Sequence, residues 1–297
     1  MAKKLLCIDN GYLYTKDSNK NIFKSAFTLT QDVLSENDYI SINNKKYFYG
    51  VGNTCTDIDK IESEINTVCS LTSIAKAGDG DYIVCANLPI VQYKSNKDKL
   101  INTIKSYNNF QLVYKEKQIR YNIIEVCVLP QGVCPIYSLN SNKEAIIIDI
   151  GSNTINFSLF EFIDGKLTLT KYDTKFKGLL HLYKKVITEI NSRFTLNYDD
   201  IKAQYFLQGN PLIHDGVNKD TSFIKDIIKE YMIDVLSDFK LSFPYKTTEI
   251  YVGGGGAELL YLIFQSNFPS AIKIPNPQFA NVNGMVAKCK QLYSQWL

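Results

Sequence analysis

The chain has 297 residues, 45% of them hydrophobic and 21% charged, and its 33 Lys and Arg residues almost balance 30 Asp and Glu residues, for a net charge of +3. This composition is typical of globular proteins long enough for two domains, and it excludes a disordered chain. No dense basic run is present and no segment approaches the roughly 18 apolar residues of a membrane helix, so we expect neither direct nucleic-acid binding nor a membrane partner.

The cysteine and histidine content bears on the cellular compartment and on possible metal sites. The seven cysteines lie scattered in apolar strings without a CxxC pair, and the only histidines are His181 and His214. An odd number of such cysteines favours free, buried thiols in a reducing compartment, so we expect a cytoplasmic protein. The same counts predict that the chain lacks the ligands for a zinc site.

The first half alternates predicted strands and helices. Asn10-Gly11 predicts a type I′ turn that joins strands at 4–9 and 12–16, and 21–29 adds a third strand. Apolar residues at helical spacing predict a helix over 59–78, which Gly78 would end in a left-handed cap. A strand at 81–90, a helix at 97–107 and a hairpin within 111–129 follow. This alternation indicates an α/β fold.

The pattern around the first turn recurs later in the chain. In "EAIIIDIGSNTINFSLF" a strand again ends in Asp and then Gly, and an Asp164-Gly165 turn starts a third strand. Asp149 stands 140 positions after Asp9, so the chain contains two copies of one supersecondary unit. We therefore predict a duplicated fold with a cleft between two domains, 1–140 and 141–278, with the terminal helix at 279–297 packing back onto the first domain.

The second half continues with helices and a glycine run. Helical spacing predicts helices over 178–190 and 220–239, the latter with a cap signal at Asp220 and Thr221. "TEIYVGGGGAELLYLIF" then runs from a strand through four glycines directly into a helix.

These segments contain the groups that bind a nucleotide triphosphate. Gly11 and Gly151 would let backbone amides approach phosphates, Lys16 would supply a cation, and Asp9 and Asp149 would hold the water shell of a magnesium ion. Each piece alone also suits an ordinary turn or a solvated lysine, and the glycine run suits a tight strand-to-helix connection. The sequence contains no GxxxxGK[ST], which excludes a Walker-type loop.

Three segments in order, "CIDNGYLYTK", "IIIDIGSNTINFSLF" and "IYVGGGGAELL", resemble the phosphate 1, phosphate 2 and adenosine motifs of the actin superfamily. "ANLPI", "VLPQGVCPIY" and "NPQFANVNGM" are similar to bacterial ParM/Alp-type actin-like plasmid-segregation proteins. The resemblance implies an actin-like, ribonuclease H-like duplicated fold. It also implies that phosphate is bound by the residues Asp9, Asn10, Gly11, Lys16, Asp149, Gly151, Ser152 and Asn153, and the nucleoside by Gly253, Gly254 and Gly255.

The resemblance further assigns Gln131 to the position that orients the attacking water. A neutral amide can place this water but cannot take its proton. The alternative for Gln131 is an N-terminal helix residue that follows Pro130. The first turn departs from the family pattern, because Tyr12, Leu13 and Tyr14 stand where relatives carry small residues.

The function implied by the resemblance is a filament-forming ATPase, or GTPase, that uses Mg²⁺. It would assemble head to tail and move plasmid or phage DNA through a DNA-binding adaptor protein. A small-molecule kinase on the same fold is the first alternative and requires a carboxylate base. A monomeric chaperone-like ATPase is the second alternative, although the chain lacks a separate substrate-binding domain.

Overall fold

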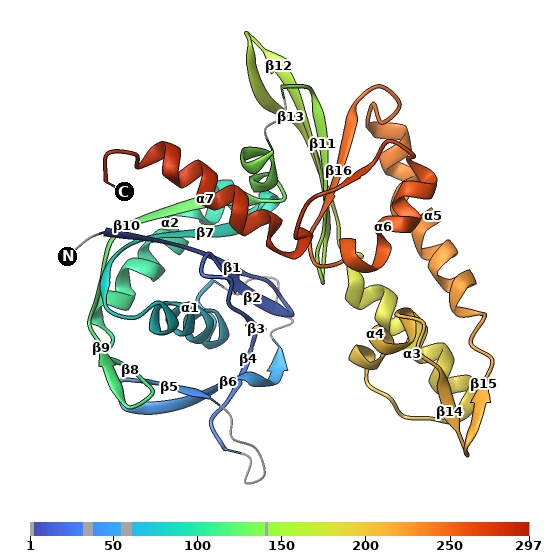
Figure 1. Ribbon diagram of the computed structural model, residues 1–297, viewed down its shortest axis with the longest axis horizontal. Coiled ribbons are helices and arrows are strands. Elements are labelled where there is room, and N and C mark those ends of the chain that lie inside the picture. The colour runs from blue at the N-terminus through green and yellow to red at the C-terminus, as the bar shows by residue number, and fades with distance from the viewer. Residues whose placement is uncertain (1–2, 32–37, 55–60, 140–141, 297) are drawn as a thin grey trace. The chain divides into compact units, whose positions relative to one another are not determined.

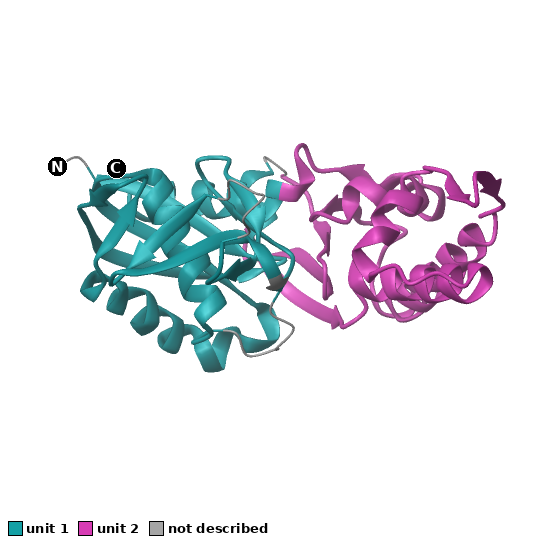
Figure 2. Ribbon diagram, turned by 90° about the horizontal axis from the view of Figure 1, so that it is seen from below, with its two compact units in different colours: residues 1–140, 279–297 teal, residues 141–278 magenta. Residues whose placement is uncertain are grey.

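The computed structural model describes residues 3–31, 38–54, 61–139 and 142–296. The chain forms two compact units. Unit 1 comprises Met1–Asn140 together with Phe279–Leu297, and unit 2 comprises Ser141–Gln278. Figure 2 shows the C-terminal segment in the colour of unit 1. Among the residues with a described structure, none of the helices combines the length and the apolar sequence that crossing a membrane requires.

Unit 1 is built on a five-stranded mixed sheet. In spatial order its strands are β10 (Tyr121–Gln131), β7 (Gly80–Pro89), β1 (Lys3–Asn10), β2 (Tyr14–Asp17) and β3 (Ile22–Lys24). Strands β1, β2 and β3 form an antiparallel meander, whereas β7 and β10 run parallel to β1. The end of β1 is therefore flanked by an antiparallel hairpin partner on one side and a parallel strand on the other.

Helices cover both faces of this sheet, and Figure 1 shows α1 and α7 on opposite sides of it. The helices of unit 1 are α1 (Glu64–Ala77), α2 (Ile90–Ser106) and α7 (Ala280–Leu292), with short 3-10 turns at Tyr107–Asn109 and Cys134–Ser138. Leu6 and Ile8 of β1 join the core beneath α1 and α2, while Cys7 joins the core beneath α7. The side chains of β1 thus alternate between two cores, as a strand buried on both faces requires.

A second sheet in unit 1 contains the hairpin predicted within 111–129. Its strands, in spatial order, are β4 (Ala26–Thr28), β6 (Lys45–Thr54), β5 (Tyr39–Ile42), β8 (Leu112–Tyr114) and β9 (Lys117–Ile119). Strands β8 and β9 form the hairpin that we expected within 111–129. Strand β10 lies outside that hairpin and pairs parallel with β7.

Unit 2 repeats the sheet of unit 1. In spatial order its strands are β13 (Lys166–Lys175), β12 (Ile155–Ile163), β11 (Ala145–Ile150), β16 (Glu249–Gly253) and β17 (Ile272–Lys273). The first three strands form an antiparallel meander, and β16 runs parallel to β11, as β7 does to β1. Asp164 and Gly165 both have positive φ, as a type I′ turn requires, and join β12 to β13. The internal duplication predicted from the sequence is present in the strand order of both sheets.

The remaining elements of unit 2 are helices and one small hairpin. They are α3 (Leu179–Phe194), α4 (Ala203–Leu207), α5 (Ile224–Ser242), α6 (Ala257–Asn267), β14 (Leu212–His214) and β15 (Val217–Lys219), with 3-10 turns at Asp200–Lys202 and Pro277–Phe279.

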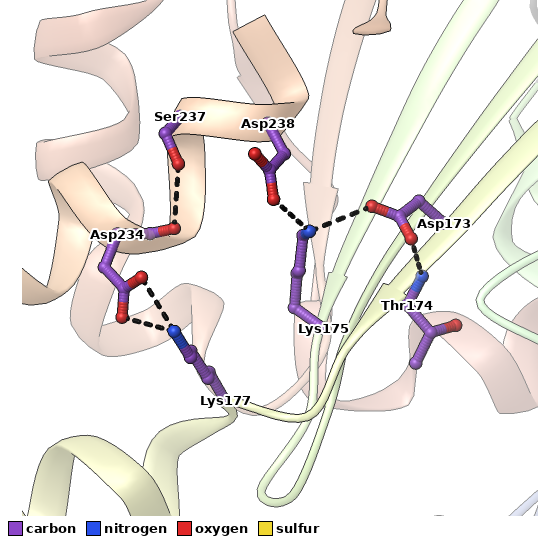
Figure 3. A network of polar contacts seen from close by, with 7 residues as sticks. All are labelled: Asp173, Thr174, Lys175, Lys177, Asp234, Ser237 and Asp238. Carbon is purple, nitrogen blue, oxygen red and sulfur yellow. Dashed lines mark hydrogen bonds and ion pairs between the residues drawn. The ribbon is translucent and has the colours of Figure 1, made fainter. Parts of the chain in front are cut away.

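Ion pairs hold the segment that leads from β13 into α3 against α5 (Figure 3). Lys175 contacts Asp238 at 2.5 Å, and Lys177 contacts Asp234 at 2.6 Å. The hydrogen bond from Lys177 also lowers the pKa of Asp234. Tyr231, buried in α5, donates its hydroxyl proton to the Lys177 carbonyl at 2.7 Å. Because exposed ion pairs contribute at most about 1 kcal/mol, the buried tyrosine is the stronger anchor of this segment.

Three predicted helix starts are wrong. The helix predicted from 97 begins seven residues earlier, at Ile90, directly after β7 ends at Pro89. The helix predicted from 59 begins at Glu64, because the Ser63 side chain accepts the Asn66 N–H and caps it, while 59 and 60 lie outside the described residues. The helix predicted from 220 begins at Ile224, because Asp220 accepts hydrogen bonds from Ser222 and forms a separate turn. The predicted end at Gly78 is confirmed, with φ of +81° and bonds to the last turn of α1.

Gly284 allows α7 to pack closely against the 3-10 turn at Cys134–Ser138. A Cβ atom at this position would lie 1.8 Å from the Cys134 carbonyl oxygen. Helix propensity alone predicts that Gly284→Ala stabilises α7 by about 1 kcal/mol. We expect the opposite sign, a loss of about 1–3 kcal/mol in the free energy of unfolding, because the overlap forces α7 away from its partner.

Urea denaturation checks this prediction. Lys290→Ala, at an exposed position of the same helix, is the control and should change stability by less than about 0.5 kcal/mol. An unchanged or increased stability of Gly284→Ala would show that α7 does not depend on this contact.

Candidate functional site

The first hairpin places Asp9 and Lys16 side by side. Asp9 pairs with Lys16 and Asn10 with Thr15, and the Gly11 N–H donates to the Tyr14 carbonyl at 3.1 Å. Neither Asn10 nor Gly11 has positive φ, so the predicted type I′ turn is wrong. Strand β1 continues through Asn10 instead, and the turn lies at residues 12 and 13.

Close packing explains why the first hairpin needs glycine. A Cβ atom on Gly11 would lie 2.7 Å from the Tyr14 carbonyl oxygen and 3.3 Å from Lys16 Nζ. Glycine is therefore required by the space between the strands, not by its φ. It also leaves the Lys16 ammonium next to bare backbone.

The Asp9 carboxylate is buried and fully engaged by neighbouring strands. Lys16 Nζ lies 3.1 Å from Oδ2, and Asn87 Nδ2 of β7 donates to Oδ1 at 3.0 Å. An unpaired carboxylate in such a place would cost several kcal/mol, and the two donors offset this cost for Asp9, which is 2% exposed. Sequence reasoning missed Asn87, although the quoted segment "ANLPI" contains it.

The side chain of Asn10 is bonded to α1 and to β2. Its Nδ2 donates to Asn66 Oδ1 at 2.6 Å and to Ser70 Oγ at 2.8 Å, both in α1. Its Oδ1 accepts the Thr15 hydroxyl at 3.1 Å. The side chain therefore ties β1 to α1, which leaves the backbone as the part of Asn10 that a phosphate could contact.

The second hairpin has the same geometry 140 positions later. Asp149 pairs with Asn156, and the Gly151 N–H donates to the Thr154 carbonyl at 2.8 Å. A Cβ atom on Gly151 would lie 2.9 Å from that carbonyl oxygen, and Gly151 also lacks positive φ. Asp149 is 1% exposed. The two predicted phosphate turns are thus equivalent in register and in the reason for their glycine.

The partner of the carboxylate differs between the hairpins. Asn156 occupies the position that Lys16 has in the first hairpin. It is 1% exposed, and its Oδ1 accepts the Thr174 hydroxyl, yet its Nδ2 has no hydrogen-bond partner among the described residues. A buried amide donor without a partner costs about 1–3 kcal/mol and calls for an explanation such as an absent ligand. Sequence reasoning missed Asn156, which the alignment of the two hairpins would have identified.

The loop after Gly151 lies on the N-terminus of α3. The amides of Gly178, Leu179 and Leu180 donate to the carbonyls of Asn153, Gly151 and Ser152 at 2.8–3.1 Å. A Cβ atom on Gly178 would lie 2.6 Å from backbone atoms of Ser152 and Asn153. Gly178 therefore positions residues 151–153, and it is a third residue that the sequence reasoning missed.

The four glycines divide into structural and open positions. Gly254, with φ of +83°, would place a Cβ atom 2.5 Å from Asp149 Oδ1, and Gly256 would place one 2.3 Å from Ile150 Cγ2. Gly253 ends β16 and is buried beside Asp149. Only a Cβ atom on Gly255 would meet no neighbour closer than 3.9 Å. The run serves as a tight connection at two positions, and it presents open backbone at Gly255.

Gln131 is the last residue of β10 and pairs with Pro89 of β7. The alternative of a helix start after Pro130 is therefore wrong, because the following 3-10 turn begins at Cys134. Gln131 lies with Asn10 and Asn87 around one small pocket of unit 1. The next residue, Gly132, donates its N–H to Asn281 of α7 at 3.0 Å, which fixes the strand end.

Unit 1 therefore brings together Asp9, Gly11, Lys16 and Gln131, and unit 2 brings together Asp149, residues 151–153 and the glycine run. Each group lies at the carboxyl end of the central parallel strands of its sheet, where ligands bind in open α/β sheets.

Comparison with known proteins agrees with this duplicated architecture. Residues 7–133 match the family model described as the N-terminal domain of actin-like proteins. The structure resembles a ParM from Clostridium botulinum, solved as a 15-stranded filament, with a TM-score of 0.80 and 20% identity over 98% of this chain and 100% of the other. The chain has an actin-like fold.

Two further structures share this actin-like fold. An archaeal actin homologue solved in complex with ADP has a TM-score of 0.77 and 18% identity over 97% of this chain and 99% of the other. An Alp12 filament has a TM-score of 0.70 and 17% identity over 98% and 100%. No curated protein matches the chain by sequence. The predictions of an actin-like fold and of the family resemblance are confirmed.

Gly178→Ala tests whether the second hairpin of this actin-like fold depends on α3. We expect a loss of about 1–3 kcal/mol in the free energy of unfolding, because the new methyl group overlaps the backbone of residues 152 and 153. Gly255→Ala is the matched control and should stay within about 0.5 kcal/mol. Chemical denaturation of both variants gives the comparison, and equal stabilities would contradict the proposed packing.

Proposed function

We propose that this chain is a nucleotide-dependent, filament-forming ATPase that moves plasmid or phage DNA through an adaptor protein. The observation that carries the proposal is the pair of equivalent hairpins. Each ends a central strand in a buried carboxylate and follows it with a glycine that leaves no room for a side chain. One of these hairpins also carries an ammonium, and the other a buried amide donor that has no partner in the described part of the chain.

The proposed ligand is ATP, or GTP, with Mg²⁺. The residues fit such a group: Lys16 lies against the bare backbone of Gly11, and Gly254 leaves no side chain beside the Asp149 carboxylate. Asp9 and Asp149 would hold the water shell of the ion, which supplies charge neutralisation of the phosphates. Ser152 and Asn153 would offer backbone amides, and Gly11 and Gly151 would allow the tight turns that bring the backbone close to the phosphates. Asn10 is positioned by α1, and Gly253, Gly254 and Gly255 would line the nucleoside.

Gln131 is the residue that we propose to orient the attacking water. The backbone at Gln131 ends a strand, and the next residue is bonded to Asn281, so the position from which the amide reaches out is held in place. Because an amide does not accept a proton at neutral pH, it would position the water without acting as a base.

Self-assembly is supported by the solved relatives that are filaments. A head-to-tail contact uses two different surfaces and gives an open filament when the rotation does not close. The near-neutral charge of this chain supports contact with DNA through an adaptor rather than directly. We found no observation that favours a small-molecule kinase over this proposal.

Assembly tests the proposal directly. With ATP or GTP and magnesium we expect sedimentable polymer above a critical concentration, and Asp149→Ala should give none, because the carboxylate that holds the ion is lost. Sedimentation and light scattering measure both, and omission of nucleotide is the control. If the protein binds nucleotide but stays monomeric at tens of micromolar at low and physiological salt, the filament proposal fails and a kinase becomes the better hypothesis.

Gln131→Ala should separate hydrolysis from assembly. We expect phosphate release to slow by roughly ten- to a thousandfold, the range for a lost positioning group, while ATP-driven assembly persists. Phosphate release and sedimentation are followed in the same sample. Gln92→Ala, which removes another amide from the same pocket, is the control and should hydrolyse normally. A normal rate in Gln131→Ala would refute the assignment.

A further inference from the structure

Three cysteines form a row across the sheet of unit 1. Cys85 of β7 pairs in register with Cys7 of β1 on one side and with Cys127 of β10 on the other. Because residues in register on neighbouring strands share a face, the three thiols lie on the side of the sheet that α7 covers. Cys289 of α7 packs against them in the same core, as does Cys134.

The sulfur atoms come close enough to share one ion. The Sγ atoms of Cys7, Cys85 and Cys289 all lie within 4.8 Å of one another, and all three residues are fully buried. In tetrahedral zinc sites the metal–sulfur distance of about 2.3 Å places sulfurs about 3.8 Å apart, so small shifts would close this triad around a metal. The expectation that the chain lacks ligands for a thiophilic ion is therefore wrong.

The fold itself does not require cysteine at these positions. Unit 2 repeats the same sheet, and there the residues that correspond to Cys7 and Cys85 are Ile147 and Tyr251, which pair in the same way. Packing alone is thus satisfied by ordinary apolar and aromatic side chains. The concentration of thiols beneath α7 is a property of unit 1 only.

We propose that Cys7, Cys85 and Cys289 form a structural binding site for a thiophilic d¹⁰ cation, zinc(II), that clamps α7 to the central strands of unit 1. Cys127, which is half-buried and pairs in register with Cys85, is the candidate for a fourth ligand. Thiolates are the ligands that such ions prefer, and a closed set of three or four sulfurs is typical of structural rather than catalytic sites.

Binding would exchange protons for the metal ion. Metal ions bind the thiolate form of cysteine, so every coordinating thiol that is protonated must lose its proton to water as the ion enters, and uptake should strengthen as pH rises. No electron transfer takes part in this step.

The metal site would stabilise the hairpin that carries Asp9, from the face of the sheet that α7 covers. Cys7 precedes Asp9 by two residues on the same face of β1, and Cys85 precedes Asn87, the partner of the Asp9 carboxylate, by two residues on β7. An ion held by both strands and by α7 would fix the register of these residues. The inference does not depend on the proposed nucleotide or filament function.

Metal titration of the reduced full-length protein tests the proposal. We expect about one equivalent of Zn²⁺ to bind with a raised melting temperature, and Co²⁺ used as a probe to give intense thiolate charge-transfer absorption with the visible bands of a tetrahedral site. Cys289→Ser should lose at least a hundredfold in zinc affinity. A wild-type protein that stays below a tenth of an equivalent would overturn the proposal.

Matched variants separate coordination from packing. Cys134→Ser removes a thiol from the same core but outside the triad, and Cys69→Ser removes a buried thiol from α1; both should bind zinc as the wild type does. Should Cys289→Ser fail to fold, Cys289→Ala and Cys7→Ala provide the same test. Equal loss of zinc in the control and triad variants, or unchanged binding in the triad variants, would overturn the assignment.

Discussion

The burial of a charged carboxylate at the end of a central strand is the constraint on which both units depend. Removing Asp9 from water costs several kcal/mol unless donors on neighbouring strands replace the water. Lys16 on β2 and Asn87 on β7 do so, at 3.1 Å and 3.0 Å. This arrangement requires β1 to lie between an antiparallel and a parallel partner, and the same strand order surrounds Asp149 in unit 2. The order of the strands therefore determines which donors can reach the buried carboxylate.

The residue paired with the buried carboxylate carries a different charge in the two hairpins. Unit 1 offsets its carboxylate with the Lys16 ammonium, whereas unit 2 places the neutral amide of Asn156 at the corresponding position. Under our proposal, a divalent cation would offset part of the negative charge of the two carboxylates and of a polyanionic ligand. The buried N–H donor of Asn156, which lacks a partner among the described residues, would be available to an acceptor oxygen of such a ligand.

Sequence patterns predicted the parts of this structure that depend on local periodicity and on repetition. The 140-residue offset between Asp9 and Asp149 correctly indicated the duplication, and Gly78 correctly marked a helix end. The first turn was predicted incorrectly, because Asn10-Gly11 suits a type I′ turn while the Asn10 side chain gains three hydrogen bonds by continuing the strand. Asn87, Asn156 and Gly178 were missed because their importance arises from contacts across strands and helices. The cysteine row is invisible in the sequence for the same reason, since register alone brings Cys7, Cys85 and Cys127 together.

A double-mutant cycle on nucleotide binding tests most directly whether the two hairpins hold one magnesium nucleotide. The affinity of ATP with Mg²⁺ would be measured by calorimetry for the wild type, Asp9→Asn, Asp149→Asn and the double variant, and again with the metal chelated. If both carboxylates act on the same ion, each single variant should weaken binding, and the double variant should lose about 0.5–3 kcal/mol less than the sum of the two. The differences should vanish without magnesium. Strictly additive losses, or an unchanged affinity in Asp149→Asn, would contradict a shared site.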